Sequence, residues 1–343
     1  MTEFPEDTQA LDAWAGQHVK GYAGPSKAIK YPTGQSNPTY KIETPTRAYV
    51  LRRKPPGKLL KSAHMVEREF RVMRALHAQG FPTPEMLALC EDEGVAGSVF
   101  FLMAHVDGRI FWDPGMAGAT REERTGVYDA MNATLAQLHT INLEAAGLSD
   151  YGKPGNYFAR QVQRWGEQYR SSETVAIPDM NRLIDWLGAH MPPDDGRVAL
   201  VHGDFRIDNM IFANESPRLL AVLDWELSTL GHPFADLAYQ CMQWRLPNAN
   251  DFRGLDGLDR AALGIPSDAD YIAAYCRRTG IDGVPHWPFL IAFSFFRIAA
   301  IAQGVYKRAL DGNASNPQRG IKMGAGVPLM AKLAMAEAEG RAA

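Results

Sequence analysis

The chain has few cysteines, and none of them is spaced as part of a ligand pair. The 343 residues include only Cys90, Cys241 and Cys276, far apart and without a C-x-x-C motif. This spacing predicts neither a disulfide framework nor a zinc site. Three scattered cysteines are typical of a reducing compartment, so we expect a cytoplasmic protein.

The sequence also lacks an excess of charge of either sign. Its 36 Lys and Arg residues oppose 39 Asp and Glu residues, for a net charge of -3. Such a balance gives no broad electrostatic attraction to nucleic acid or to an anionic membrane. We therefore expect neither as a partner, although local basic clusters could still bind phosphate.

No hydrophobic run is long enough to predict a membrane span. The most apolar segment, residues 289–305, is interrupted by Arg297 and is shorter than the roughly 20 apolar residues that a spanning helix needs. It is interpreted as a buried helix. The N-terminal segment, residues 1–16, is acidic and lacks the basic start and apolar centre of a secretory signal. No internal repeat indicates a solenoid.

What the sequence does contain is two stretches of different character. Residues 46–53 and 97–108 are strand-like runs ended by Pro-Pro-Gly and Asp-Gly, and residues 62–80 between them have the apolar spacing of a helix. Beyond about residue 108, helical patterns dominate. We predict an α+β fold of two lobes, a small lobe with a sheet and one main helix over residues 1–104 and a larger, mostly helical lobe over 105–343.

The second lobe contains an unusual concentration of charge after a short predicted strand. In VHGDFRIDNMIF, Asp204 follows His202-Gly203, and Asn209 lies five residues further on. The pattern H-G-D-x-x-x-x-N resembles the catalytic loop of kinases. A second predicted strand, residues 219–223, ends at Asp224, about where kinases place the metal-binding aspartate of D-F-G.

Phosphoryl transfer explains these residue types. Hard oxygen ligands hold Mg²⁺ against the phosphates, and Asn209 and Asp224 would supply such oxygens. A further carboxylate must orient the incoming hydroxyl and accept its proton, a role that suits Asp204. Taken alone, the loop could also be a polar connection between a strand and a helix.

Two longer segments carry a resemblance to a known family. HGDFRIDNMIF and VLDWELSTLGHPFADLAY resemble the aminoglycoside phosphotransferase and choline kinase-like superfamily, small-molecule kinases with a protein-kinase-like fold. Together with VLRRKPPG and SAHMVEREF, they look most like the kinase-like domains fused to acyl-CoA dehydrogenases. The resemblance extends from about Tyr31 to about Arg308 and implies ATP, with GTP not excluded, and Mg²⁺ as cofactors.

The resemblance implies a cation and a partner carboxylate in the first lobe. Arg52 matches the kinase lysine, with arginine in its place, and Val50 matches the side chain that faces the adenine. Helical rotation of about 100° per residue puts Glu69 on the apolar face and Glu67 away from it. We therefore pair Glu69 with Arg52. A surface charge at Arg52 and an unrelated ion pair at Glu69 are the alternatives.

The resemblance also implies backbone contacts to the nucleotide. The turn that includes Gly34 and Ser36 would lie over the phosphates. In the segment that joins the lobes, Met103, Ala104 and Val106 would line the adenine, with the Ala104 carbonyl and the Val106 amide bonding its edge.

Other charged residues of the motifs have less specific interpretations. Arg206 occupies the position at which many protein kinases have a lysine that reaches the γ-phosphate. His202 is expected to brace the loop, and Asp208 to be solvated or to cap the loop. Asp236 is expected to cap its helix and anchor the catalytic loop. Glu226 is open to a water-mediated metal contact or a substrate contact.

The leading hypothesis is an ATP–Mg²⁺-dependent kinase that phosphorylates a small-molecule alcohol. The absence of a distinctive acidic cluster, with Arg245 and Arg297 and many aromatics, favours a hydroxy acid or hydroxyacyl-CoA over an aminoglycoside or amino alcohol. Trp225, Trp244, Tyr239, Phe295 and Arg297 are candidates for the walls of the acceptor site, although such residues more often belong to the core. A non-catalytic pseudokinase and a protein kinase remain as alternatives, and the sequence does not indicate an oligomeric state.

Overall fold

The computed structural model describes residues 7–32, 37–55, 64–249, 252–313 and 316–341. Contacts between residues divide the chain into two compact units, which we call unit 1 and unit 2. Unit 1 comprises Met1–Ile110, Glu144–Leu148 and Asn209–Leu227, and unit 2 comprises Phe111–Leu143, Ser149–Asp208 and Ser228–Ala343. Asn209–Leu227 thus groups with the N-terminal sheet, whereas the sequence analysis assigned it to the helical lobe.

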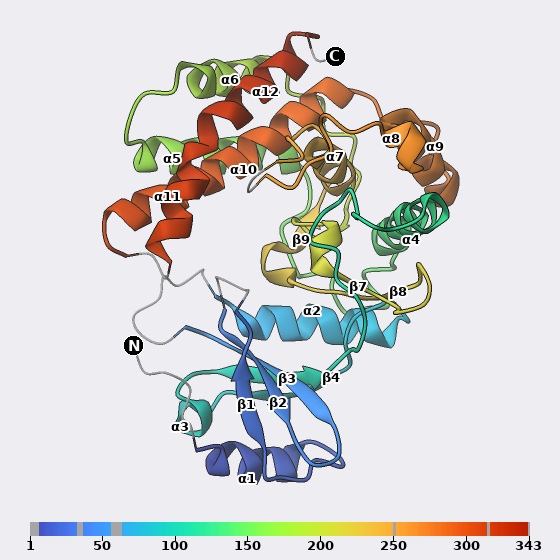
Figure 1. Cartoon of the computed structure of the whole chain (residues 1–343). Coiled ribbons are helices and arrows are strands. Elements are labelled where there is room, and N and C mark those ends of the chain that lie inside the picture. Colours follow the sequence, from blue (N-terminus) through green and yellow to red (C-terminus); the bar gives the residue numbers. More distant parts are fainter. Residues whose placement is uncertain (1–6, 33–36, 56–63, 250–251, 314–315, 342–343) are drawn as a thin grey trace. The chain divides into compact units, whose positions relative to one another are not determined.

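A five-stranded antiparallel sheet with the order β1-β2-β3-β5-β4 forms the centre of unit 1 (Figure 1). Its strands are β1 (Lys27–Lys30), β2 (Thr39–Glu43), β3 (Ala48–Arg53), β4 (Met86–Cys90) and β5 (Phe100–Ala104). Leu51 and Leu102 point into a core shared with α1 (Gln9–His18), near the short helix α3 (Glu93–Ala96). Strand alternation then turns the intervening residues toward the opposite face.

The opposite face of the sheet packs against α2 (Val66–Ala78). Phe70 of α2 and Phe101 of β5 place their ring centroids 6.1 Å apart. A small hairpin of β7 (Met210–Phe212) and β8 (Leu219–Val222) completes unit 1 with the short helix η2 (Trp225–Leu227), which contacts α2. The hairpin is what brings the two predicted metal ligands into this unit.

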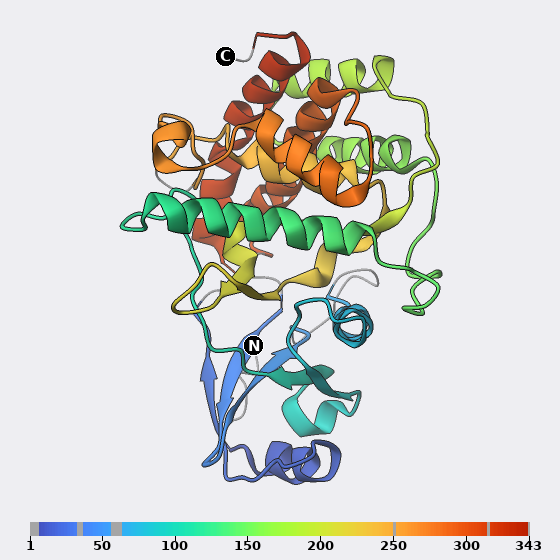
Figure 2. The ribbon, with the colours of Figure 1, turned by 90° about the vertical axis from the view of Figure 1, so that its right-hand side faces the viewer.

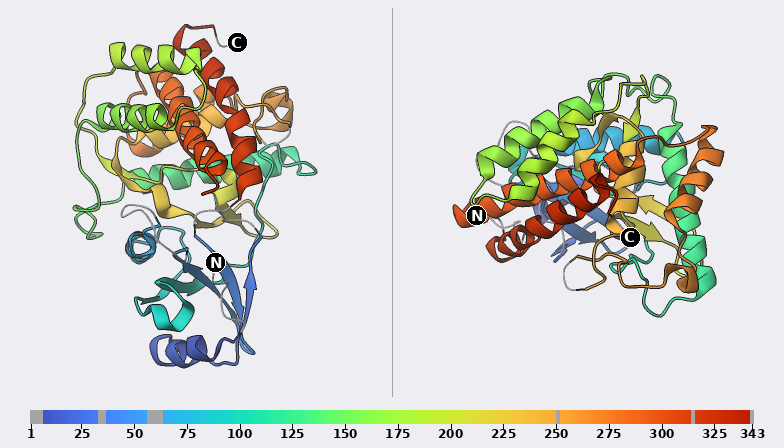
Figure 3. Two further views of the ribbon diagram at one scale, coloured as in Figure 1. Left: turned by 90° about the vertical axis from the view of Figure 1, so that its left-hand side faces the viewer. Right: turned by 90° about the horizontal axis from the view of Figure 1, so that it is seen from above.

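Unit 2 consists mainly of helices. They are α4 (Arg121–His139), α5 (Tyr157–Ser172), α6 (Pro178–Ala189), α7 (Phe234–Gln243), α8 (Arg260–Leu263), α9 (Asp268–Thr279), α10 (Trp287–Leu310), α11 (Pro317–Ala325) and α12 (Val327–Ala338), and the unit also contains the antiparallel strands β6 (Ala199–Val201) and β9 (Thr229–Gly231). Helix α10 packs against α5, α6, α7, α11 and α12 (Figure 3), and α4 packs against α9 (Figure 2). The short helix η1 (Ile207–Asn209) joins the two units.

The apolar segment 289–305 lies within α10, as a buried helix. Among the described residues, α10 is the one helix long and apolar enough to cross a membrane, and 78% of its most apolar window is buried inside the protein. Helices buried in a protein core can be equally long and apolar. The burial of α10 therefore agrees with the interpretation of residues 289–305 as a buried helix.

Candidate active site

In unit 1, the predicted site residues gather around Arg52, whose side chain is 12% exposed. Its Nε lies 2.9 Å from Glu69 Oε2, and one terminal nitrogen lies 2.6 Å from Asp224 Oδ1. The same nitrogen is 3.7 Å from Glu226 Oε2. The predicted Arg52–Glu69 pair is therefore present, and the planar guanidinium reaches a second carboxylate at the same time through a different nitrogen.

Glu69 owes its position to the helical spacing of α2. Its side chain is 2% exposed, whereas Glu67 is partly exposed and pairs with Lys54. Glu69 Oε1 also accepts a hydrogen bond of 2.8 Å from the side-chain amide of Asn37. Burial raises the pKa of the Glu69 carboxyl to about 7, although Arg52 opposes this increase. The pKa of Arg52 is raised too, because the attraction of Glu69, Asp224 and Glu226 outweighs its burial.

Asn209 and Asp224 flank the same end of the β7–β8 hairpin. Met210 pairs with Val222, and the amide of Leu223 donates to the Asn209 carbonyl at 2.8 Å. Asp224 follows with a φ of +66°, a left-handed conformation that aspartate tolerates better than most residues. This geometry puts the two predicted metal ligands next to each other along the hairpin.

The oxygen donors of Asn209 and Asp224 fit a hard cation such as Mg²⁺, which keeps several waters and takes only one or two carboxylates. The guanidinium on Asp224 shows that this carboxylate already attracts a positive charge. Over the described part of the chain, no group of three or more His, Cys, Asp or Glu side chains could hold a metal ion. Phosphate oxygens and waters would complete the coordination of a Mg²⁺ ion held by these two donors.

The predicted adenine-facing residues lie on neighbouring strands. Val50 of β3 is directly paired with Met103 of β5, and both are 8% exposed. Ala104 is paired with Tyr49, and Val106 follows the end of β5. Gly34 and Ser36 lie outside the described residues. The roles of all these residues toward a nucleotide stay predictions.

In unit 2, the loop after β6 presents Asp204. His202 is fully buried, and its Nδ1 accepts a hydrogen bond of 3.1 Å from the Asp204 amide, as expected for a histidine that braces the loop. Asp236 accepts hydrogen bonds from the His202 amide at 2.6 Å and the Gly203 amide at 2.9 Å. It therefore anchors the catalytic loop, as predicted.

The predicted capping role of Asp236 is wrong, because α7 begins at Phe234 and its N-terminal cap is Pro233. Asp236 lies inside the first turn and is 1% exposed. Burial opposes its ionisation, but the His139 side chain, His202 and the Gly203 amide together lower the pKa of its carboxyl. The carboxylate is thus held ionised inside the core of unit 2.

Arg206 is bound by Asp208 rather than directed to solvent. Its Nε donates to Asp208 Oδ1 at 2.8 Å, and Arg253 donates to Asp208 Oδ2 at 3.0 Å. The Asp208 side chain is 8% exposed, so its predicted solvated state is wrong. The two guanidinium groups lower the pKa of Asp208 against the effect of its burial. Arg206 Nε lies 4.0 Å from Asp204 Oδ1.

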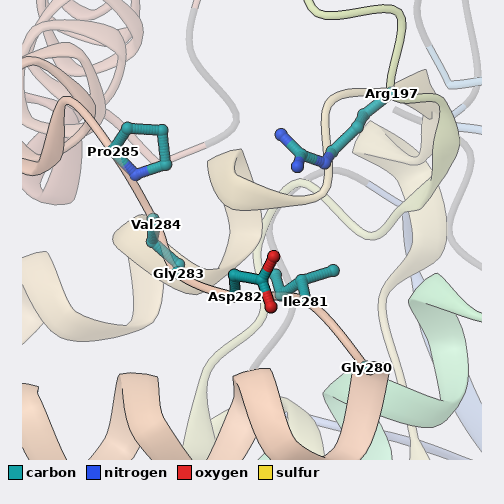
Figure 4. A pocket seen from close by; sticks show the side chains of 7 residues that line it. All are labelled: Arg197, Gly280, Ile281, Asp282, Gly283, Val284 and Pro285. Atoms are coloured by element: carbon teal, nitrogen blue, oxygen red, sulfur yellow. The ribbon is translucent and has the colours of Figure 1, made fainter.

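Among the depressions on unit 2 are two that described residues line. A small one, with a cavity volume of about 20 Å³, is lined by Trp112, Pro114, Arg206, Ile207, Asp208, Gln243, Leu246, Phe252 and Arg253. The other, of about 600 Å³, is lined by Arg197 and residues 280–285 (Figure 4). Arg197 already pairs with Asp195 and lies over the Phe234 ring. Only the small depression includes a residue predicted for the site.

The sequence analysis favoured a core position over an acceptor wall for five residues, and their burial confirms this preference. Trp225, Trp244, Tyr239, Phe295 and Arg297 are at most 5% exposed. Tyr239 nevertheless contacts the site, because its hydroxyl donates to Asp204 Oδ1 at 2.7 Å. Its position three residues after Asp236, one helical turn along α7, was the available signal.

The family model described as the phosphotransferase enzyme family matches residues 27–288. The chain belongs to this family. The match, together with the catalytic-loop geometry above, supports a phosphotransferase of the small-molecule kinase class.

Curated relatives are longer proteins. The chain is 50% identical over 316 residues to mouse acyl-CoA dehydrogenase family member 10, covering 91% of the chain and 29% of that protein. It is 42% identical over 315 residues to human acyl-CoA dehydrogenase family member 11, covering 90% of the chain and 40% of that protein. The chain therefore spans less than half the length of these relatives.

A crystal structure from Ralstonia eutropha, provisionally named an aminoglycoside phosphotransferase, is 49% identical, with a TM-score of 0.88 and coverage of 98% of this chain and 99% of that one. Spectinomycin phosphotransferase in complex with ADP and spectinomycin has a TM-score of 0.64 at 13% identity, covering 96% and 98%. Choline kinase from Cryptosporidium parvum has a TM-score of 0.63 at 12% identity, covering 98% of each chain. The protein-kinase-like fold predicted from the sequence is confirmed.

Proposed function

We propose that the protein is an ATP–Mg²⁺-dependent kinase that transfers the γ-phosphoryl group to a hydroxyl of a small molecule. The observation that carries this proposal is the pair of contacts on Arg52, which joins Glu69 of α2 to Asp224 after β8. Kinases need this cation, its partner carboxylate and the metal-binding aspartate together. A nucleotide-bound relative of the same fold supports nucleotide use.

The residues would divide the chemistry as follows. Asp204 accepts the proton of the acceptor hydroxyl while the hydroxyl oxygen forms its bond to the γ-phosphorus and ADP leaves. Arg52 and Arg206 supply positive charge for the phosphates. Asn209 and Asp224 would hold Mg²⁺, which when bound neutralises phosphate charge. Val50, Met103, Ala104 and Val106 would line the adenine, and Gly34 and Ser36 would cover the phosphates.

For the acceptor, we infer a hydroxy acid or a hydroxyacyl-CoA thioester. Arg206 and Arg253 both pair with Asp208, and Arg206 also lies 4.0 Å from Asp204. The Arg253 guanidinium also lies 5.2 Å above the Trp112 ring, and Trp112 is 45% exposed. Guanidinium groups beside an exposed aromatic ring favour an anionic acceptor over a polyamine such as an aminoglycoside. We further expect a cytoplasmic protein with no nucleic-acid or membrane partner.

The test is ADP production with ATP and Mg²⁺ against separate pools of hydroxy acids, hydroxyacyl-CoA thioesters, amino alcohols and aminoglycosides. Wild type should respond to an anionic pool, and Asp204→Asn should lose the response by about a thousandfold or more. A response to the aminoglycoside pool alone would overturn the acceptor class. No response from any pool, with ATP bound, would favour a pseudokinase.

A matched pair of arginines tests the acceptor class. Arg253 and Arg164 each lie 5.2 Å above a tryptophan ring, Trp112 and Trp165, in unit 2. Arg253→Gln should lower kcat/KM for the anionic acceptor about tenfold, and Arg164→Gln should leave it unchanged. Equal effects of the two substitutions would contradict an anion-binding role for Arg253.

A further inference from the structure

One face of α7 contacts three successive residues of the catalytic loop. Asp236 accepts hydrogen bonds from the amides of His202 and Gly203. Tyr239, one turn along the same helix, donates its hydroxyl to Asp204 Oδ1 at 2.7 Å. Because side chains three residues apart share a helical face, a single rigid element sets both the loop backbone and the Asp204 side chain.

A second helix, α10, contacts the loop at the Gly203 carbonyl. Arg297 of α10 is 5% exposed and donates to the Gly203 carbonyl at 2.7 Å. Gly203 has a φ of +83°, a conformation that glycine adopts without steric cost. The Arg297 guanidinium also lies 5.8 Å from the centroid of the Tyr239 ring. Arg297 therefore contacts both the loop and the tyrosine that holds its aspartate.

The Tyr239 ring has little freedom to move. It is 3% exposed, and His139 braces the adjacent turn through Asp236 at 3.4 Å. A buried tyrosine hydroxyl needs a partner, but a backbone carbonyl would satisfy it equally well, as Pro114 does for Tyr128 at 2.8 Å. The use of Asp204 as the acceptor couples the core of unit 2 to the predicted proton acceptor.

We propose that Tyr239 is a positioning residue for phosphoryl transfer, with Arg297 supporting it. Its hydroxyl holds the Asp204 carboxylate in the orientation that receives the acceptor's proton. This inference rests on the proposed function, in which Asp204 is the proton acceptor. Phosphoryl transfer depends mainly on the orientation of the reacting groups. Loss of the hydroxyl therefore slows turnover.

The test compares Tyr239→Phe with Tyr128→Phe, which removes a buried tyrosine hydroxyl bond of similar length from the same unit. Turnover is measured with the acceptor found above or, where none is found, as slow ATP hydrolysis. Tyr239→Phe should lower kcat about tenfold with a KM for ATP within about twofold of wild type. Tyr128→Phe should keep the wild-type kcat. A kcat for Tyr239→Phe equal to that of Tyr128→Phe would overturn the inference.

Asp204→Asn, assayed in parallel, separates this inference from the proposed function. Wild-type kcat in Asp204→Asn would refute the proposed function itself. An inactive Asp204→Asn together with a fully active Tyr239→Phe would refute only the positioning role. If Tyr239→Phe does not fold, Arg297→Lys keeps the buried charge but not the guanidinium fork, and it should lower kcat about threefold or more at unchanged KM for ATP. Wild-type kcat in that variant would also count against the inference.

Discussion

The two units surround the carboxylates of their predicted site residues in different ways. In unit 1, three carboxylates, Glu69, Asp224 and Glu226, surround the single cation Arg52. In unit 2, Asp236 accepts hydrogen bonds from two backbone amides. Ion pairs can exchange one cation for another, whereas backbone amides cannot leave. We therefore expect substitutions around Arg52 to act on ligand binding and substitution of Asp236 to act on the stability of the loop.

The largest expected effects concern Asp224, which pairs with Arg52, and Asp204 of the catalytic loop. Asp224→Ala removes a carboxylate that holds Arg52 at 2.6 Å and is the predicted metal ligand. It should abolish turnover and also weaken binding of Mg²⁺–ADP about tenfold or more. Asp204→Asn should abolish turnover while nucleotide binding stays within about twofold of wild type.

Isothermal titration with Mg²⁺–ADP measures this difference directly. Binding of equal strength in the two variants would remove Asp224 from the metal site. Wild-type turnover in both would refute the site assignment as a whole.

The next largest effect is expected for Asp236, which holds the catalytic loop in unit 2. Both oxygens of Asp236 accept hydrogen bonds from backbone amides, so the NH2 group of an asparagine would face a donor. Asp236→Asn should therefore destabilise the protein by about 2–4 kcal/mol. Urea unfolding measures the change, with Asp185→Asn on the exposed surface of α6 as a control. A loss no larger than that of the control would mean that the loop does not depend on this carboxylate.

A smaller effect is expected for Arg52→Lys. The arginine contacts Glu69 through Nε and Asp224 through a terminal nitrogen, and a single ammonium keeps the charge but loses this fork. Turnover should fall about tenfold, with partial nucleotide binding retained. Arg52→Met, which loses the charge, should be far worse. Equal activity of wild type and Arg52→Lys would show that charge alone is sufficient.

Local periodicity explains what could be predicted from the sequence. Helical rotation placed Glu69 on the inward face of α2, and the family resemblance supplied Arg52 as its partner, so the observed pair followed from one local pattern and the resemblance. β7 and β9 are each three residues long, too short for any period to appear, and the sequence analysis did not predict them.

Contacts between distant parts of the chain could not be predicted in this way. Tyr239 and Asp204 are 35 residues apart, and Arg297 and Gly203 are 94 apart. Nothing local distinguishes Arg297 from other residues of an apolar helix, and the spacing of Tyr239 from Asp236 does not reveal that its hydroxyl reaches Asp204. Asp208 was predicted to be solvated or to cap the loop, because nothing near it in the sequence indicates its second arginine, Arg253, which follows 45 residues later. These contacts depend on how the helices of unit 2 pack, which no local pattern specifies.

The smallest effect is expected for the partly exposed ion pair between Glu67 and Lys54. Glu67, two residues before Glu69 on α2, pairs with Lys54 through side chains that are 33% and 24% exposed. Such pairs contribute about 0–1 kcal/mol, so Glu67→Gln should change the free energy of unfolding by at most that amount. Added salt should abolish the difference, since exposed charges are screened at high ionic strength. A larger, salt-resistant loss would mean that Glu67, and not only Glu69, belongs to the charge cluster around Arg52.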